Sequence, residues 1–155
     1  DNDLKKIIAH SGNAPEISKE DVLSTIEISP EHDVFAMIEA IGSNKKNEAY
    51  RYLNNLLADK GNVFQLLSLI TKQLEIMLTT CEMKDQGMTL KAIQTALKKS
   101  EKIHEYRTKK AYEAGNRFRK ETLKQMLLSA YEVEYNIKSG LMPERLALEF
   151  FISSI

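Results

Sequence analysis

The feature that most constrains this chain is a long apolar stripe with helical spacing between Asn62 and Gly87. Polar residues such as Gln65, Lys72 and Glu82 fall on the other side of the same helix. The pattern predicts a helix of ~23 residues, or ~35 Å, capped by Asn62 and ended by Gly87. Because one side of so long a helix must be buried, the chain has to supply other elements that pack against it. The stripe consists of Val63, Leu66, Leu67, Ile70, Leu74, Met77, Leu78 and Cys81.

The rest of the chain repeats this helical pattern in shorter stretches. No stretch alternates between apolar and polar residues for long enough to predict a strand. The connections between the stretches are short, and short loops favour antiparallel neighbours. The sequence therefore predicts an all-α helical bundle. The other helices are expected near Asp33–Gly42, from Ala49 to a stop at Gly61, and near Leu90–Leu97, Ile103–Ala114, Glu121–Ser139 and Pro143–Ile152.

The first 30 residues are expected to form a separate piece of structure. Leu4, Ile7 and Ile8 have helical spacing, and Ser18 is a suitable cap for a second short helix. Ser29-Pro30 then interrupts the chain, since a proline disfavours helical backbone in the residue before it. The predicted domains are residues 1–30 and 31–155.

Composition excludes several classes of protein. No apolar run approaches the ~20 residues of a membrane span, so no membrane contact is expected. The chain opens with Asp1-Asn2-Asp3, which is unlike a signal peptide. Its single cysteine, Cys81, excludes an internal disulfide and fits a reducing cytoplasm. These features indicate a cytoplasmic protein.

Catalytic equipment is sparse in this sequence. The nearest approach to a phosphate-binding loop, Gly42–Lys46, has one glycine and reads better as the end of a helix. His10, His32 and His104 are too far apart, and without neighbouring ligands, to predict a metal site. Cys81 lies on the apolar stripe and reads as a buried structural thiol. No catalytic, metal or cofactor site is therefore predicted.

Positive charge is concentrated in residues 91–124, which hold 11 Lys/Arg and 4 Asp/Glu although the whole chain is neutral. Tyr106, Tyr112 and Phe118 are interleaved with these charges. The segment is either a sequence-independent contact with the DNA backbone or a set of solvated helix faces whose aromatics point to the core. The candidate DNA-backbone residues are Lys98, Lys99, Lys102, Arg107, Lys109 and Lys110.

The last helix is apolar over most of its circumference, with a narrow polar strip at Arg145, Glu149 and Ser153. A helix with so few polar positions must be buried on most sides. It is either the centre of this domain or half of an interface with partner subunits, and Phe150 is expected to be buried. The candidate interface residues are Arg145, Leu146, Glu149, Phe150 and Ile152.

Several segments, in order, resemble the C-terminal part of the bacterial DNA polymerase III delta subunits, the clamp-opening subunits of clamp loaders. The family's His-Pro between Gln86 and Arg119 is missing here, where Ala92–Leu97 is followed by Ile103–Ala111. That departure leaves any contact made by this loop open. The matching segments are Leu4–Ala9 with Glu16–Val22, Asp33–Gly42, Ala49–Leu57, Phe64–Leu74, and Glu134–Gly140 with Glu144–Ile152.

The resemblance implies a helical bundle of the clamp-loader collar type, preceded by the end of an AAA+-like lid domain. The collar would bind the other clamp-loader subunits. The sliding clamp would be bound only through an N-terminal domain that this chain lacks, and any DNA contact would be weak. No cofactor is implied, because the delta subunit is not an ATPase, although the intact protein would belong to a nucleotidyltransferase, DNA polymerase III.

Two alternatives remain open from the sequence. One is the collar of a sister protein of the clamp loader, of the delta-prime or the motor type. The other is a helical adaptor protein unrelated to replication.

Overall fold

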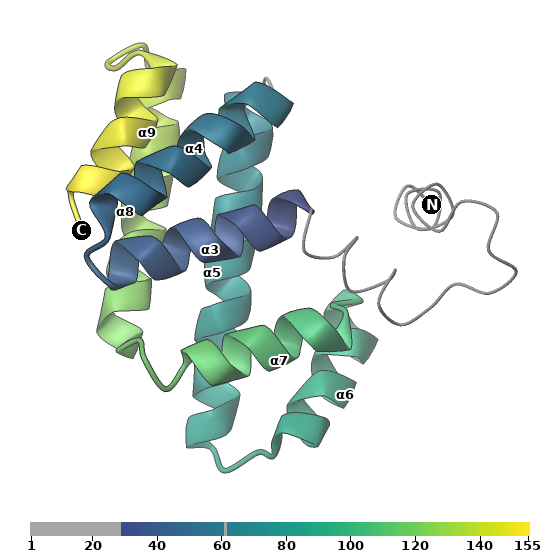
Figure 1. The fold of residues 1–155 in the computed structure, drawn as a ribbon. Helices are drawn as coiled ribbons and strands as arrows, with labels where there is room; N and C mark the ends of the chain where they lie inside the picture. Colours follow the sequence, from purple (N-terminus) through teal and green to yellow (C-terminus); the bar gives the residue numbers. More distant parts are fainter. Residues whose placement is uncertain (1–28, 61) are drawn as a thin grey trace, which may run out of the picture.

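The computed structural model describes residues 29–60 and 62–155 of the chain. This part contains seven helices and no strand (Figure 1), which confirms the predicted all-α fold for the described residues. The short helices predicted around Leu4 and after Ser18 lie outside the described residues, and the domain boundary at residue 30 stays a prediction. The helices are α3 Pro30–Gly42, α4 Lys46–Lys60, α5 Val63–Asp85, α6 Leu90–Glu101, α7 Glu105–Ala114, α8 Lys120–Lys138 and α9 Glu144–Ser153.

Helix α5 is the predicted long helix, and it runs through the middle of the bundle (Figure 1). The Asn62 side chain accepts hydrogen bonds from the backbone N–H groups of Phe64 and Gln65, at 2.9 and 3.3 Å. At the other end Gly87 has φ +82°, a backbone conformation that side chains disfavour. Helices α3, α4, α6, α7 and α8 all contact α5, so it organises the fold.

Helix α3 begins three residues earlier than Asp33, where the sequence placed its start. Ser29 is its N-cap, accepting a hydrogen bond from the His32 N–H at 3.3 Å. Pro30 occupies the first helical position, where its fixed φ suits the helix and its missing N–H costs nothing. The proline that was predicted to interrupt the chain therefore starts a helix.

Helices α6 and α7 also differ in their bounds from the prediction. Helix α6 extends four residues past Leu97, to Glu101. Helix α7 starts at Glu105 and not at Ile103, because the His104 side chain caps it by accepting a hydrogen bond from the Tyr106 N–H at 3.2 Å. Ile103 is a buried residue of the connecting loop.

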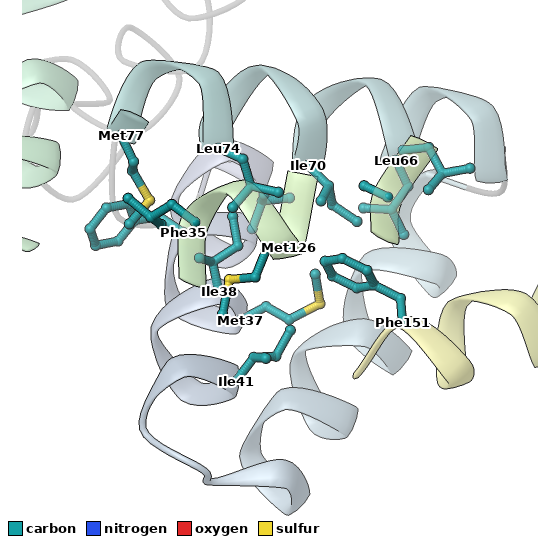
Figure 2. Packing of buried hydrophobic residues seen from close by; sticks show 14 of the residues in the cluster. Phe35, Met37, Ile38, Ile41, Leu66, Ile70, Leu74, Met77, Met126 and Phe151 are labelled. Carbon is teal, nitrogen blue, oxygen red and sulfur yellow. The ribbon is translucent and has the colours of Figure 1, made fainter. Parts of the chain in front are cut away.

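One core holds the described helices together. Figure 2 shows Met37 and Ile38 of α3, Leu74 of α5, Met126 of α8 and Phe151 of α9 gathered in one cluster. Burial of each aliphatic side chain in such a closely packed core stabilises the fold by about 1.5–3 kcal/mol. Because Phe151 belongs to this cluster, the last helix, α9, is packed onto the core.

Helix α8 packs against the core along one apolar side. Leu123, Met126 and Ala130 on that side are fully buried. Leu127 and Ile137 pack at the edge of the core and are only partly buried.

No helix in the described part of the chain is long and apolar enough to cross a membrane.

Candidate interface and basic surface

Helix α9 has one buried side and one apolar side open to solvent. Ala147, Leu148 and Phe151 are buried against α8 and α4. Leu146 and Phe150, on the other side, are 53% and 43% exposed. The two readings of this helix from sequence are therefore not exclusive, since part of it is core and part is apolar surface.

The polar strip of α9 forms the seam with α4. Arg145 donates from Nε to Glu149 Oε1 at 2.9 Å and from Nη2 to Asn54 Oδ1 at 2.8 Å. Farther along, Lys46 Nζ donates to the Ser153 carbonyl oxygen at 2.9 Å. Exposed pairs of this kind add little stability, so their main effect is to fix the charges beside Leu146 and Phe150.

The structure brings four of the five predicted interface residues to one surface, which we call the α9 surface. It comprises Arg145, Leu146, Glu149 and Phe150. Ile152 is excluded, because it lies one turn after Leu148 on the core side and is fully buried. The buried aromatic of this helix is Phe151, at 1% exposed, and the expectation that Phe150 is buried was wrong.

Sequence reasoning missed a second exposed apolar stripe, on α8. Leu128 is 68% exposed, and Tyr131 and Tyr135 are exposed as well. The Tyr131 hydroxyl donates to Glu75 Oε1 at 3.0 Å, and this hydrogen bond raises the pKa of Tyr131. The three residues are spaced three and four apart, which was the available signal, but the core stripe on the same helix obscured it.

The basic segment does not form one surface. The Arg107 guanidinium turns inward and donates from Nη2 to Gln73 Oε1 of α5 at 2.8 Å. Burial lowers the pKa of Arg107. Arg107 is therefore part of the α5–α7 packing, and its place among the DNA-backbone candidates was wrong.

Lys109 and Lys110 of α7 have partners on their own helix. Lys109 Nζ lies 3.9 Å from Glu113 Oε1, and Lys110 Nζ lies 5.6 Å from the centre of the Tyr106 ring. The exposed side of α7 thus carries both signs of charge. This arrangement favours a solvated face over an anion site.

Helix α6 is different, because positive charge dominates its outward side. Ile93 and Leu97 face the core, while Lys91, Lys98 and Lys99 are exposed. Lys102, the residue that caps the helix, is exposed next to them. We call these four lysines the α6 basic face; Lys91 was not among the residues predicted from sequence.

Two of the three aromatics of the basic segment, Tyr112 and Phe118, pack against the core. A Cβ atom on Gly42 would lie 2.0 Å from the Phe118 ring, so that ring rests directly on the glycine. Tyr112 is partly buried, with Lys84 Nζ 4.6 Å from its ring centre. For these two residues the packing agrees with the reading in which the aromatics face the core.

A cavity of about 190 Å³ lies beside Cys81. Lys84 and Lys120 line it, but Lys84 donates a hydrogen bond to Asn116 and Lys120 forms an ion pair with Asp85. Burial raises the pKa of the Cys81 thiol more than Lys84 lowers it, so the thiolate is disfavoured. The site fits the predicted structural role of Cys81.

Comparison with known proteins gives consistent matches. A family model described as "DNA polymerase III delta subunit, C-terminal domain" matches residues 31–155. DNA polymerase III subunit delta of Bacillus subtilis (strain 168) is 27% identical over 150 residues, covering 97% of this chain and 42% of the relative. The solved structure of the Bacillus subtilis DNA clamp loader delta protein (YqeN) superposes with a TM-score of 0.76 at 26% identity, covering 99% of this chain and 44% of that one. The chain thus spans less than half the length of each relative.

Proposed function

The chain belongs to the family formed by the C-terminal domains of DNA polymerase III delta subunits, and from this premise we propose that it is a non-catalytic collar module that joins the subunits of a clamp loader. The relative and the solved structure are both delta proteins, which supports the delta assignment over a sister protein of the loader or an unrelated adaptor. The module would contribute binding surface and no reaction chemistry of its own.

The observation that carries this proposal is the division of α9 between core and surface. Phe151 and Leu148 anchor the helix in the bundle, so its position is fixed before any partner arrives. Leu146 and Phe150 are left exposed beside an Arg145–Glu149 pair. Exposed aromatic and aliphatic side chains with a charged rim are typical of protein–protein interfaces.

The roles of the whole protein extend this proposal. The sliding clamp would be bound by a part of the delta protein outside this chain, and DNA would be touched weakly by the collar. The complex would work in the cytoplasm, where chromosomal replication in bacteria takes place.

The adjacent residues Phe150 and Phe151 provide the test. In the intact delta protein, Phe150→Ala should leave the fold unchanged and weaken entry into the clamp-loader complex about tenfold or more. Phe151→Ala should instead destabilise the domain by about 3–5 kcal/mol, because it opens a cavity in the core. Reconstitution with the other subunits, followed by size-exclusion chromatography with light scattering, measures assembly, and urea denaturation measures folding.

A charge reversal sharpens the same test. Glu149→Lys replaces the carboxylate that Arg145 contacts with a second cation, and it should affect assembly more than folding. If both Phe150→Ala and Glu149→Lys enter the complex with unchanged affinity, the α9 surface is not an interface and the proposal fails.

A further inference from the structure

We propose that the α6 basic face, Lys91, Lys98, Lys99 and Lys102, binds the sugar-phosphate backbone of double-stranded DNA without reading its sequence. This inference rests on the proposed function and deepens its weak DNA contact by naming the residues and the mode of binding. It is independent of the α9 surface, because Figure 1 shows α6 and α9 at opposite ends of the described part.

The four lysines are placed by the periodicity of α6. Ile93 and Leu97 fix the inner side of the helix against the bundle, so the lysines point outward. From Lys91 to Lys102 the helix advances roughly 16 Å at about 1.5 Å per residue. Phosphates on one strand of a duplex repeat about every 3.4 Å along the axis, so several lie within reach of this face.

Charge on this face is left largely uncompensated. The two carboxylates nearest in sequence are already engaged, since Glu101 pairs with Lys72 on α5 and Glu105 pairs with Lys98 at 3.1 Å. In the part of the chain that the structure describes, no carboxylate forms an ion pair with Lys91, Lys99 or Lys102. The hydrogen bond from Lys98 and the charges of Lys98 and Lys91 lower the pKa of Glu105, as a locally positive surface should.

The chemistry of the face favours nucleic acid over an acidic peptide. A peptide interface draws most of its energy from aromatic, aliphatic or Arg anchors in pockets. The exposed uncharged residues of α6 are Ala92, Thr95 and Ser100, and none of them offers such an anchor. Lysines are point charges that meet phosphates without base readout, and the affinity they give depends on salt.

Two triple variants distinguish the effect of the α6 basic face on DNA binding from the effect of net charge. The parent chain is formally neutral, so any DNA binding must come from a local surface. Lys91→Gln/Lys99→Gln/Lys102→Gln removes three charges from the α6 basic face, and Lys45→Gln/Arg51→Gln/Lys124→Gln removes three exposed charges from other helices and a loop. All six positions are exposed, so both variants should fold, and circular dichroism checks this.

Fluorescence anisotropy with a labelled duplex of arbitrary sequence, titrated at several salt concentrations, measures the outcome. The α6 triple should weaken binding at low salt about tenfold or more and reduce the slope of log K against log salt by roughly 2.7. The control triple should change the affinity less than about threefold. This pattern supports the proposal.

Three results would overturn the proposal. Equal losses in the two triples would show that binding depends on net charge and not on the α6 basic face. Binding of polyglutamate but not of duplex DNA would identify an acidic peptide as the ligand. Absence of binding to either probe at low salt would remove the DNA contact altogether, while leaving assembly through α9 to be judged by its own variants.

Discussion

Phe150 and Phe151 are adjacent in sequence, yet one is 43% exposed and the other 1%. The same contrast occurs on α8, where Leu123 is fully buried and Leu128 is 68% exposed. At the scale of the residue, the direction of each side chain from its helix decides whether it stabilises the fold or remains available to a partner. Pairs of identical residue type in opposite surroundings therefore make controlled experiments.

The α8 pair tests the phase of that helix. Leu123→Ala should destabilise the protein by about 2–5 kcal/mol, because it leaves a cavity in the core. Leu128→Ala, the same chemical change on the exposed side, should stay within about 0.5 kcal/mol. Urea denaturation followed by circular dichroism gives both values, and similar losses in the two variants would contradict this phase of the helix.

Cys81 offers a probe of folding that depends on pH. Because its folded pKa is raised by burial, the native thiol should react with maleimide or disulfide reagents far more slowly than the thiol of the unfolded chain. As pH rises through about 8.5 the unfolded thiol ionises before the folded one, because burial raises the folded pKa, so this residue should lower stability as pH rises. Labelling rates with and without urea test the slow reaction of the native thiol. The pH dependence of stability, compared with that of Cys81→Ala, tests the effect of ionisation. Fast labelling of the native protein would contradict both predictions.

At the scale of the element, the ends of a helix are set by its caps. Helix α6 is capped at its C-terminal end by Lys102, whose φ of 56° places a lysine in the left-handed region that glycine usually occupies at such caps. A non-glycine residue costs about 1–2 kcal/mol in this conformation. The strained residue belongs to the α6 basic face, so the lysine that is proposed to contact DNA also lowers the stability of the helix end.

Lys102→Gly should therefore raise stability while weakening DNA binding. The gain should be at most about 1 kcal/mol, since relief of backbone strain is partly offset by the greater freedom of glycine in the unfolded chain. Lys102→Ala is the matched control, because it removes the charge and keeps the Cβ atom. Thermal or urea denaturation of the two variants separates strain from charge, and a loss of stability in Lys102→Gly would show that the lysine side chain itself supports the cap.

At the scale of the whole molecule, one core supports two separate surfaces. Helix α5 contacts five other helices, and Phe151 of α9 reaches the same core as Met37 of α3 (Figure 2). The α9 surface and the α6 basic face lie at opposite ends of this framework (Figure 1). Because the two proposed surfaces are separated, binding at one would not block binding at the other.

The whole chain is also expected not to bind Mg-ATP. The sequence has no glycine-rich loop followed by Lys-Ser or Lys-Thr, and the nearest approach, Gly42–Lys46, closes α3. Isothermal titration with Mg-ATP should give no heat beyond dilution. Micromolar binding would contradict this prediction and would point to a nucleotide site formed without that loop.

The sequence by itself determined the helices, most of their ends and the family. These depend on local interactions, since the 3.6-residue period and caps such as Asn62 act within a few residues of one another. The ordered motifs that indicated a delta protein are also written along the chain. Among the misread ends, α6 extends four residues past Leu97, and α3 starts at Pro30, because the same proline can end one segment or begin the next.

Only the tertiary structure decided which side chains are free. Arg107 turns inward because Gln73, 34 positions away, accepts its hydrogen bond. Glu101 leaves the α6 basic face because Lys72, 29 positions away, attracts it to α5. Phe150 is exposed because α4 and α8 cover the other side of α9. Each outcome is set by contacts between helices distant in sequence, and a single helix does not contain that information.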